Sequence, residues 1–508
     1  MTMNRKPKMI YPSPKEFLTL CQKGNLIPVY QEILDDLETP VSAYFKIAQK
    51  AKYSFLLESV EGEEKVARYS FLAKDPELIF QSKGRDAEIL QLNDKGITRG
   101  QLKVIDTPLS FIREIMSQYN LVTVDGLPPF CGGMVGYIGY DTVRFFEQLP
   151  QKTHDDLYLP DIVMVLAKNL IIFDHRNHKI KIVSCAHIDS KSTPRQKRKL
   201  YDKAIDEIDS LIAELNKPLA VDHDNPVTPI HLKVRSNFTE SQFRNIVVKA
   251  KEKIKAGDII QTVLSQRFHT KVKTNPFNVY RALRALNPSP YMYFLNLSGI
   301  HIVGSSPELL IRCEDGIVET RPIAGTRPRG KTEKEDANLA KDLLADPKER
   351  AEHIMLVDLG RNDLGRVCEK GTVKVSEFMA VEKYSHVMHI VSNVKGKLKK
   401  NKDIFDVLQA SFPAGTVSGA PKIRAMEIIE ELEDLCRGPY AGCIGYFSFS
   451  GNLDTCITIR TIIVKDGLAY IQAGAGIVAD SNPQKEYFET VNKAKAQMAA
   501  IELAQSQM

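Results

Sequence analysis

The sequence has 508 residues but no tryptophan, which is unusual at this length and excludes an indole ring from every site in the chain. Its 8 cysteines lie far apart, and no two of them form a C-x-x-C pair. This spacing excludes the common zinc and redox motifs and is typical of reduced thiols in a cytosol. We therefore expect a cytoplasmic protein.

Long hydrophobic runs are also missing. No stretch of about 18 apolar residues exists, so we expect no membrane span. The first residues, MTMNRKPKMIYPSPKEF, are basic but include no apolar core, so they do not form a secretory signal. The net charge is only +6, and the densest basic patch lies at 392–402. This pattern excludes a nucleic-acid-binding stripe and a membrane-binding basic helix.

Apolar residues make up 43% of the chain, which is enough for a substantial core. The length allows roughly two to four average domains. Residues 216–236 carry three prolines and no periodic pattern, so we place a boundary there. The predicted organisation is an N-terminal lobe at 12–215, a linker at 216–236 and a second domain at 237–505.

Turn signals indicate the fold class. Asp315-Gly316 and Asp466-Gly467 each lie between two strand-like segments, and Asp-Gly is a strong hairpin signal. Between these hairpins we expect a charged loop at 331–350. Antiparallel hairpins with segregated helices favour an α+β fold over a wound parallel sheet.

Two segments of the N-terminal lobe have unusual strand patterns. Residues 132–140 contain too much glycine for an ordinary strand, so we expect backbones to approach closely there. Residues 162–173 are predicted to form a strand that pairs with 179–183 around a turn.

The stretch at 470–493 is predicted to run from a strand into a glycine turn at 473–476. A helix then begins at Pro483, since proline suits the first helical position. Backbone N–H groups at a glycine turn can bind a carboxylate or a phosphate. The stretch also matches a loose dinucleotide fingerprint, Gly474-x-Gly476-x-x-Ala479, but no second strand follows the helix. We therefore favour an anion site over a dinucleotide site.

Two carboxylates on predicted helices, Glu352 and Glu489, are candidate metal ligands. A lone helical carboxylate usually faces solvent, and Glu489 could simply form an ion pair with Lys493. Together, however, the two would provide the sparse oxygen ligation that suits a Mg²⁺ ion that keeps waters and binds an anionic substrate.

Three other side chains are candidates for chemistry. His389 lies in an alternating strand, where it could equally be an ordinary core histidine. Arg460 lies in an apolar strand and suits a bidentate clamp for a carboxylate. Thr416 lies in a predicted tight turn whose spacing fails the phosphate-loop motif. These residues indicate a magnesium-dependent site for a small anion with more than one carboxylate.

Seven longer motifs occur in order along the chain. They are LLESVEG at 56–62, NPSPYM at 287–292, TRPIAGT at 320–326, EHIMLVDLGRNDLGRV at 352–367, PAGTVSGAPK at 413–422, GYFSFSGNLDTCITIRT at 445–461 and AGAGIVADSNPQKEYFET at 473–490. Together they resemble the anthranilate synthase component I family of chorismate-utilising enzymes over nearly the whole chain. Ala67 and Ala73 depart from this pattern, because the family usually has glycines there.

The resemblance implies two β-sheets sandwiched between helical layers, with an N-terminal regulatory lobe packed on a C-terminal chorismate-binding catalytic portion. It implies a lyase that converts chorismate and ammonia to anthranilate and pyruvate, the first committed step of tryptophan biosynthesis. It also implies Mg²⁺ as cofactor and feedback inhibition by L-tryptophan. A separate glutamine amidotransferase subunit, component II, would supply the ammonia.

The resemblance also assigns roles to individual residues. Glu352 and Glu489 are expected to bind Mg²⁺, and Glu308 to protonate the departing C4 hydroxyl. His389 is expected to act in the elimination of pyruvate, and Thr416 completes the catalytic set. The expected substrate-binding residues are Gly325, Thr326, Tyr440, Arg460, Gly474, Ala475, Gly476 and Lys493. The expected tryptophan-binding residues are Glu58, Ser59, Pro290, Tyr291 and Met292.

Two positions distinguish the expected activity from those of related families. Aminodeoxychorismate synthases commonly carry a nucleophilic lysine where Ala324 stands, and isochorismate and salicylate synthases carry a water-activating lysine where Gln261 stands. Alanine is no nucleophile and glutamine is a poor base, so the expected nucleophile is ammonia. The alternatives are aminodeoxychorismate synthase component I and a non-catalytic tryptophan-sensing homologue.

Overall fold

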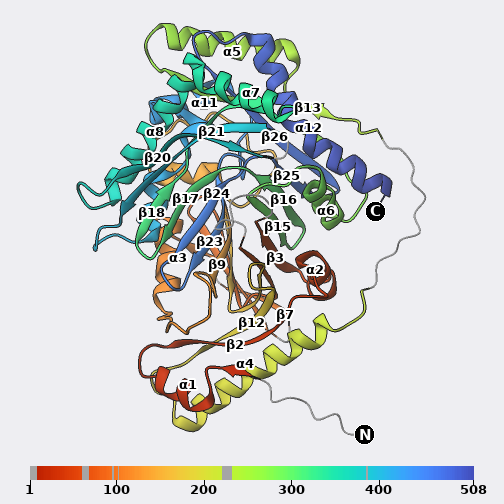
Figure 1. Ribbon diagram of the computed structural model, residues 1–508, viewed down its shortest axis with the longest axis vertical. Helices are drawn as coiled ribbons and strands as arrows, with labels where there is room; N and C mark the ends of the chain where they lie inside the picture. The colour runs from red at the N-terminus through yellow and green to blue at the C-terminus, as the bar shows by residue number, and fades with distance from the viewer. Residues whose placement is uncertain are drawn as a thin grey trace.

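Two β-sheets of 13 strands each form the centre of the part of the chain that the computed structural model describes. That part comprises residues 9–59, 68–93, 96–100, 102–219, 231–384 and 387–507. Helices pack around the sheets (Figure 1). In that view the N-terminal half, red to yellow, lies mainly in the lower part, and the C-terminal half, green to blue, lies mainly in the upper part.

The first sheet contains strands from both halves of the chain. Its order is β1 (Ile10–Tyr11), β2 (Leu26–Leu34), β12 (Lys179–His187), β11 (Asn169–Asp174), β4 (Tyr69–Lys74), β3 (Tyr53–Glu58), β15 (Tyr291–Leu297), β16 (Ile300–Ser306), β25 (Thr461–Lys465), β26 (Leu468–Ile477), β14 (Gln261–Lys271) and β13 (Arg235–Ser236), with β22 (Gly419–Ala420) beside β14.

The second sheet also contains strands from both halves of the chain. Its order is β19 (Ile323–Pro328), β21 (Val387–Lys397), β18 (Ile317–Thr320), β17 (Leu309–Glu314), β24 (Leu453–Ile457), β23 (Cys443–Ser448), β9 (Gly133–Ile138), β10 (Ile162–Ala167), β5 (Leu78–Lys83), β6 (Asp86–Asn93) and β7 (Gly96–Arg99), with β20 (Lys374–Lys383) beside β21 and β8 (Lys103–Val104) beside β6.

The helices of the described residues include several that begin with proline, which is favoured at the first helical position. They are α1 (Pro14–Leu20), α2 (Pro40–Ile47), α3 (Pro108–Ser117), α4 (Pro194–Leu215), α5 (Glu240–Lys255), α6 (Pro276–Leu286), α7 (Glu333–Ala345), α8 (Pro347–Val367), α9 (Ile404–Ser411), α10 (Gly415–Ser418), α11 (Lys422–Leu432) and α12 (Pro483–Gln507), with a 3₁₀ helix at Tyr140–Phe145.

Strands from both sides of the predicted linker join each sheet. In the first sheet β3 pairs antiparallel with β15, and in the second sheet β9 pairs antiparallel with β23. The predicted α+β class with two sheets is confirmed. The domain boundaries at 12–215, 216–236 and 237–505 stay a prediction, and residues 220–230 of the linker lie outside the described residues.

The two halves of the chain repeat one order of elements. The first half runs α1-β2-α2-β3-β4-β5 and later β9-β10-β11-β12-α4. The second half runs α5-β14-α6-β15-β16-β17 and later β23-β24-β25-β26-α12. The chain crosses between the sheets at 75–77 and 168 in the first half, and at 307–308 and 458–460 in the second half. These crossings place side chains at the edges of two cavities.

Helices α1, α2, α4, α6 and α12 cover the outer face of the first sheet. Tyr201 of α4 and Tyr280 of α6 share one hydrophobic cluster with Ile182 and Phe294 of the sheet. Full burial of such a side chain contributes about 1.5–3 kcal/mol, so this layer holds the helices in place.

The glycine turn predicted at 473–476 is wrong. These residues lie inside β26, where Gly474 stands opposite Ser265 and Gly476 stands opposite Val263 of β14. Pairing with β14 keeps the backbone extended, so the glycines do not serve to turn the chain. The helix predicted to begin at Pro483 is confirmed.

Two other predictions are corrected. The charged loop expected at 331–350 contains α7, because Thr332 accepts a hydrogen bond from Glu335 N and so caps the helix. The strand expected at 162–173 is two strands in different sheets, because the chain crosses at Lys168.

Parts of two predictions lie outside the described residues, namely Ala67 and positions 60–62 of the first motif.

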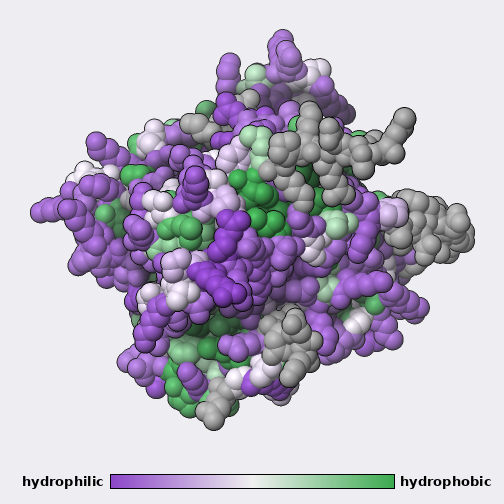
Figure 2. Space-filling model, turned by 90° about the horizontal axis from the view of Figure 1, so that it is seen from below, coloured by the Kyte–Doolittle hydropathy of each residue, from purple (hydrophilic) through white to green (hydrophobic). Residues whose placement is uncertain are grey.

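Among the described residues, no helix combines the length and the apolar character that crossing a membrane requires. The face of the molecule in Figure 2 is mostly hydrophilic, with smaller hydrophobic areas between the polar ones.

The close approach predicted at 132–140 is confirmed. A Cβ atom at Gly136 would lie 1.9 Å from the carbonyl oxygen of Val163 on β10, and one at Gly133 would lie 2.0 Å from that of Phe447 on β23. No side chain fits at such distances, so glycine lets β9, β10 and β23 pack at the junction of the two halves.

We predict that Gly136→Ala lowers the free energy of unfolding by about 3 kcal/mol or more, because the new methyl group would push β9 and β10 apart. Thermal unfolding at a fixed scan rate measures this. Gly365→Ala is the control, since its Cβ would meet no atom within 4 Å on α8. Helix propensity should make the control slightly more stable. An unfolding temperature of Gly136→Ala equal to that of the wild type would contradict the packing account.

Candidate active site

A cavity of about 530 Å³ lies between β26, α8, α10, α12 and the crossings of the second half. Most of the predicted substrate, catalytic and metal residues line it. They are Glu308, Gly325, Thr326, Glu352, Thr416, Tyr440, Arg460, Gly474, Gly476, Glu489 and Lys493. The structure therefore brings together eleven predicted residues that come from eight separate parts of the chain.

Four carboxylates face the cavity from two helices, Glu349 and Glu352 from α8 and Glu486 and Glu489 from α12. Burial raises the pKa of Glu349, and the neighbouring Glu352 raises it further. Burial likewise raises the pKa of Glu486, with Glu489 adding to the rise. This concentration of negative charge fits a bound cation.

The donor set suits Mg²⁺ in particular. Glu352 accepts a hydrogen bond from Gln261 Nε2 at 3.2 Å, and Glu489 forms an ion pair with Lys493 at 2.7 Å. Within the described residues, no group of three or more His, Cys, Asp or Glu side chains is arranged to hold a metal. Mg²⁺ usually binds through one or two carboxylates and keeps several waters, so Glu352 and Glu489 fit it without a third protein ligand.

Glu308 is a buried acid at the crossing between β16 and β17. Its residue surface is only 9% exposed. Burial raises the pKa of its carboxyl to about 8, although the Thr416 hydroxyl and the Lys493 ammonium oppose the rise. The carboxyl is therefore protonated at neutral pH and can act as a general acid.

Arg460 lies at the neighbouring crossing, between β24 and β25. Its φ of 53° is in the left-handed region, which a side chain rarely adopts. Its guanidinium donates to Lys493 O at 2.5 Å, and Lys493 Nζ donates to Gly474 O at 2.9 Å. Burial lowers the pKa of Arg460, opposed by the nearby Tyr440 and Glu489. The two cations form a positive end of the cavity.

Gly474 and Gly476 form one wall of the cavity. A Cβ at Gly474 would lie 2.6 Å from the Tyr440 hydroxyl, and one at Gly476 would lie 2.6 Å from Gln261 Nε2. Glycine thus leaves room for a ligand against the backbone. Ala475, between them, turns its side chain to the other face of β26 and is buried in a separate cluster with α5.

His389 contacts two residues that line the cavity, Gly325 and Thr326. Its Nδ1 is 2.9 Å from Gly325 O and 3.1 Å from Thr326 Oγ1. A carbonyl oxygen only accepts hydrogen bonds, so Nδ1 carries the proton and Nε2 keeps a free electron pair. Burial lowers the pKa of His389, so the neutral ring is favoured. Gly325, at a β-bulge with a φ of 70°, and Thr326 both line the cavity and both contact the ring.

A buried ion pair behind Tyr440 was not predicted from the sequence. Arg437 NH2 is 2.7 Å from Glu433 Oε1, and both side chains are almost fully buried. The guanidinium stacks at 5.5 Å on Tyr440 and at 4.7 Å on Tyr140, and it donates to Val417 O at 2.7 Å. The one sequence signal for this ion pair is that Glu433 and Arg437 lie four residues apart. The pair holds the Tyr440 wall against both halves of the chain.

The five predicted tryptophan-binding residues lie at the junction of β3 and β15, where Glu58 stands opposite Met292. Glu58 accepts hydrogen bonds from Arg284 and Tyr280 of α6. Tyr291 donates to Asp454 of the second sheet at 2.9 Å, so the two side chains use opposite faces of the first sheet.

Ser59 and Pro290 complete this predicted tryptophan-binding group. Pro290 is buried, directly before β15. Ser59 Oγ is buried and has no hydrogen-bond partner among the described residues. A buried hydroxyl without a partner costs free energy, so its satisfaction by a ligand would be favourable.

Comparison with known proteins gives consistent relatives. A family model for chorismate binding enzymes matches residues 53–499. The chain is 49% identical to anthranilate synthase component 1 of Acetivibrio thermocellus, over 98% of this chain and 99% of that protein. It is also 49% identical to anthranilate synthase component 1 of Aquifex aeolicus, over 97% of this chain and 98% of that protein.

Solved structures with the same fold include an anthranilate synthase component I and an isochorismate synthase. The crystal structure of anthranilate synthase component I from Streptococcus pneumoniae TIGR4 is similar with a TM-score of 0.75 and 39% identity, over 92% of this chain and 99% of that chain. The menaquinone-specific isochorismate synthase of Escherichia coli has a TM-score of 0.68 at 19% identity, over 96% of this chain and 99% of that chain, and shows the fold alone.

Proposed function

Since the chain belongs to the anthranilate synthase component I family of chorismate-binding enzymes, we propose that its cavity binds chorismate and converts it with ammonia to anthranilate and pyruvate. The observation that carries this proposal is Glu308, a buried acid that faces Arg460 and Lys493 across the cavity. A dicarboxylate that must lose a hydroxyl as water needs such an acid beside such cations.

In the first step, Arg460 and Lys493 hold the enolpyruvyl carboxylate of chorismate against the Gly474–Gly476 wall. Ammonia bonds to C2, and the C4 hydroxyl leaves as water after it takes the proton of Glu308. Mg²⁺, when held by Glu352 and Glu489, supplies positive charge that orients and neutralises the ring carboxylate. Thr416, Gly325, Thr326 and Tyr440 shape the cavity around the ring.

In the second step, pyruvate is eliminated and the ring becomes aromatic. The hydrogen bond of His389 Nδ1 to Gly325 O supports a role for His389, because it leaves Nε2 free to accept a proton. We propose that His389 acts at this step, and that its contact with Thr326 orients the strand that closes the cavity.

Ammonia as the nucleophile follows from two side chains. Ala324 offers no amine, which disfavours aminodeoxychorismate synthase activity. Gln261 is neutral and donates to Glu352, so it does not act as a base towards water. We propose that a separate glutamine amidotransferase subunit supplies the ammonia in the cell.

The direct test is product identification by chromatography after incubation of the isolated chain with chorismate, Mg²⁺ and an ammonium salt. We expect anthranilate and pyruvate in equal amounts without any partner protein. Aminodeoxychorismate or isochorismate as the product would overturn the proposed reaction, and no product at all would favour a non-catalytic homologue.

We predict that Glu352→Gln and Glu489→Gln each weaken Mg²⁺ binding by about tenfold or more and abolish turnover, because each removes one charged ligand. Calorimetry with Mg²⁺ measures the affinity independently of activity. Glu333→Gln on α7 is the matched control and should bind Mg²⁺ normally. Full Mg²⁺ affinity in both site variants would show that the metal binds elsewhere.

We further propose that L-tryptophan inhibits the enzyme by binding at the β3–β15 junction. Support comes from the unpartnered Ser59 hydroxyl and from the buried Pro290 and Met292, which offer apolar surface. Inhibition requires that tryptophan favours one state of the enzyme, and linkage then requires chorismate to weaken tryptophan binding by the same factor.

We predict that Ser59→Ala raises the inhibitory concentration of L-tryptophan about tenfold, while its activity without tryptophan stays near that of the wild type. The reason is that Ser59 Oγ has no partner to lose among the described residues. Met292→Thr should act in the same direction. If wild type and both variants respond equally to tryptophan, the regulatory site lies elsewhere or does not exist.

A further inference from the structure

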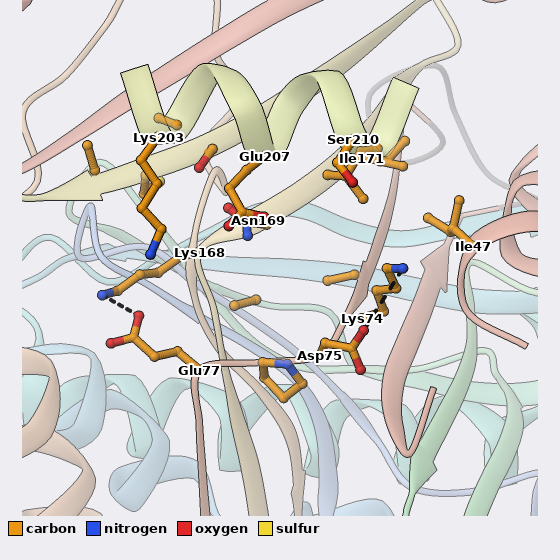
Figure 3. Close-up of a pocket in the computed structure, with 18 of the residues that line it drawn as sticks. Ile47, Lys74, Asp75, Glu77, Lys168, Asn169, Ile171, Lys203, Glu207 and Ser210 are labelled. Atoms are coloured by element: carbon orange, nitrogen blue, oxygen red, sulfur yellow. Dashed lines mark ion pairs between the residues drawn. The ribbon is translucent and has the colours of Figure 1, made fainter. Parts of the chain in front are cut away.

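The structure has a second cavity, of about 790 Å³, at the crossings of the N-terminal half, between α4 and strands β4, β11 and β12 (Figure 3). Its charged side chains include two ion pairs, Lys168 with Glu77 at 2.6 Å and Lys74 with Glu214 at 2.7 Å. Among the described residues, no side chain that lines it has a buried polar atom without a hydrogen-bond partner. This lining therefore indicates no particular ligand.

The candidate active site differs, because it contains such a side chain in addition to those with a role above. Gln497 of α12 lines this cavity. It is fully buried, and neither its Oε1 nor its Nε2 has a hydrogen-bond partner among the described residues. Burial of an amide without hydrogen bonds costs free energy, because both groups lose the water that they would otherwise bind. A ligand that supplies a partner recovers this cost, so Gln497 indicates a contact that forms when the cavity is filled.

One backbone oxygen places Gln497 beside the cations at the positive end of the cavity. In an α-helix the N–H of residue i donates to the carbonyl oxygen of residue i−4, so Lys493 O is the helical acceptor for the backbone N–H of Gln497. Arg460 Nη1 donates to the same oxygen at 2.5 Å. The Arg460 guanidinium therefore lies next to the turn of α12 that joins Lys493 to Gln497.

The side chain of Gln497 extends towards the same end. Side chains on a helix lean towards its N-terminus, so the amide of Gln497 lies over the turn that carries Lys493. Both residues line the cavity, and Lys493 Nζ donates to Gly474 O at 2.9 Å on its wall. Gln497 thus adds a neutral donor and acceptor to the two cations.

We propose that Gln497 is a further substrate-binding residue, and that its amide N–H donates a hydrogen bond to the enolpyruvyl carboxylate beside Arg460 and Lys493. This inference rests on the proposed function, since that carboxylate belongs to chorismate. Arg460 carries five N–H donors, so one of them can satisfy the carbonyl oxygen of Gln497 while the amide N–H groups face the anion. Lys493 shifts from Gly474 O towards the same carboxylate, which opens the contact to the buried amide.

Calorimetry on the full chain with Mg²⁺ and without ammonia tests this role, because chorismate then binds without reacting. We expect Gln497→Leu to bind chorismate about tenfold more weakly than the wild type. Anthranilate lacks the enolpyruvyl carboxylate, so both proteins should bind it equally. With an ammonium salt, the KM for chorismate should rise about tenfold at an unchanged kcat, as expected for a contact made equally in the bound substrate and in the transition state.

Stability and two more variants separate this role from a structural one. Gln497→Leu removes an unpaired amide from the interior, so its unfolding temperature without ligand should equal or exceed that of the wild type. Gln497→Glu should weaken chorismate binding at least as much, because its carboxylate competes with the substrate for Arg460 and Lys493. Gln484→Leu, at an exposed position of the same helix, is the matched control and should equal the wild type in every measurement.

Three results would overturn the proposal in distinguishable ways. Equal chorismate affinity in the wild type and Gln497→Leu would mean that a buried water alone satisfies the amide. An equal loss of chorismate and anthranilate affinity, together with a lower unfolding temperature, would mean that Gln497 only supports the fold. No chorismate binding by the wild type would overturn the proposed function, and the role of Gln497 with it.

Discussion

The candidate active site depends on the contact between two segments, 307–308 and 458–460, at which the chain crosses from one sheet to the other. Ile457 N donates to Glu308 O at 3.0 Å, and Ser306 Oγ donates to Ile457 O at 2.7 Å. These bonds fix the crossing at 307–308 against the crossing at 458–460. An acid from one strand and Arg460 from another therefore face one cavity, although they lie far apart in the sequence.

The repeated order of elements explains why the molecule has cavities at two such places. Each half crosses between the sheets twice, and each places a helix over the crossings. The halves meet where β3 pairs with β15 and where Gly133 lets β9 approach β23 closely. A ligand at the β3–β15 junction would contact both halves, which is where binding can alter their relative stability.

Local signals in the sequence predicted much of this structure. Asp-Gly turns predicted the hairpins at 315–316 and 466–467, and the motifs predicted the residues that line the candidate active site. Long-range geometry was not predictable in the same way. Whether 473–476 turns or stays extended depends on pairing with β14, and the division of 162–173 depends on a crossing that no local pattern marks. The Glu433–Arg437 pair was missed because a charged pair at helical spacing usually faces solvent.

Burial gives the site its chemistry, because desolvation raises the pKa of Glu308 and keeps its carboxyl protonated at neutral pH. Infrared difference spectroscopy of wild type against Glu308→Gln during a pH titration measures this directly. The account predicts a protonated carboxyl band at neutral pH that is lost as the pH rises through about 8. A band lost near the ordinary glutamate value of 4.5 would contradict it, since Glu308 would then be ionised and unable to act as the acid.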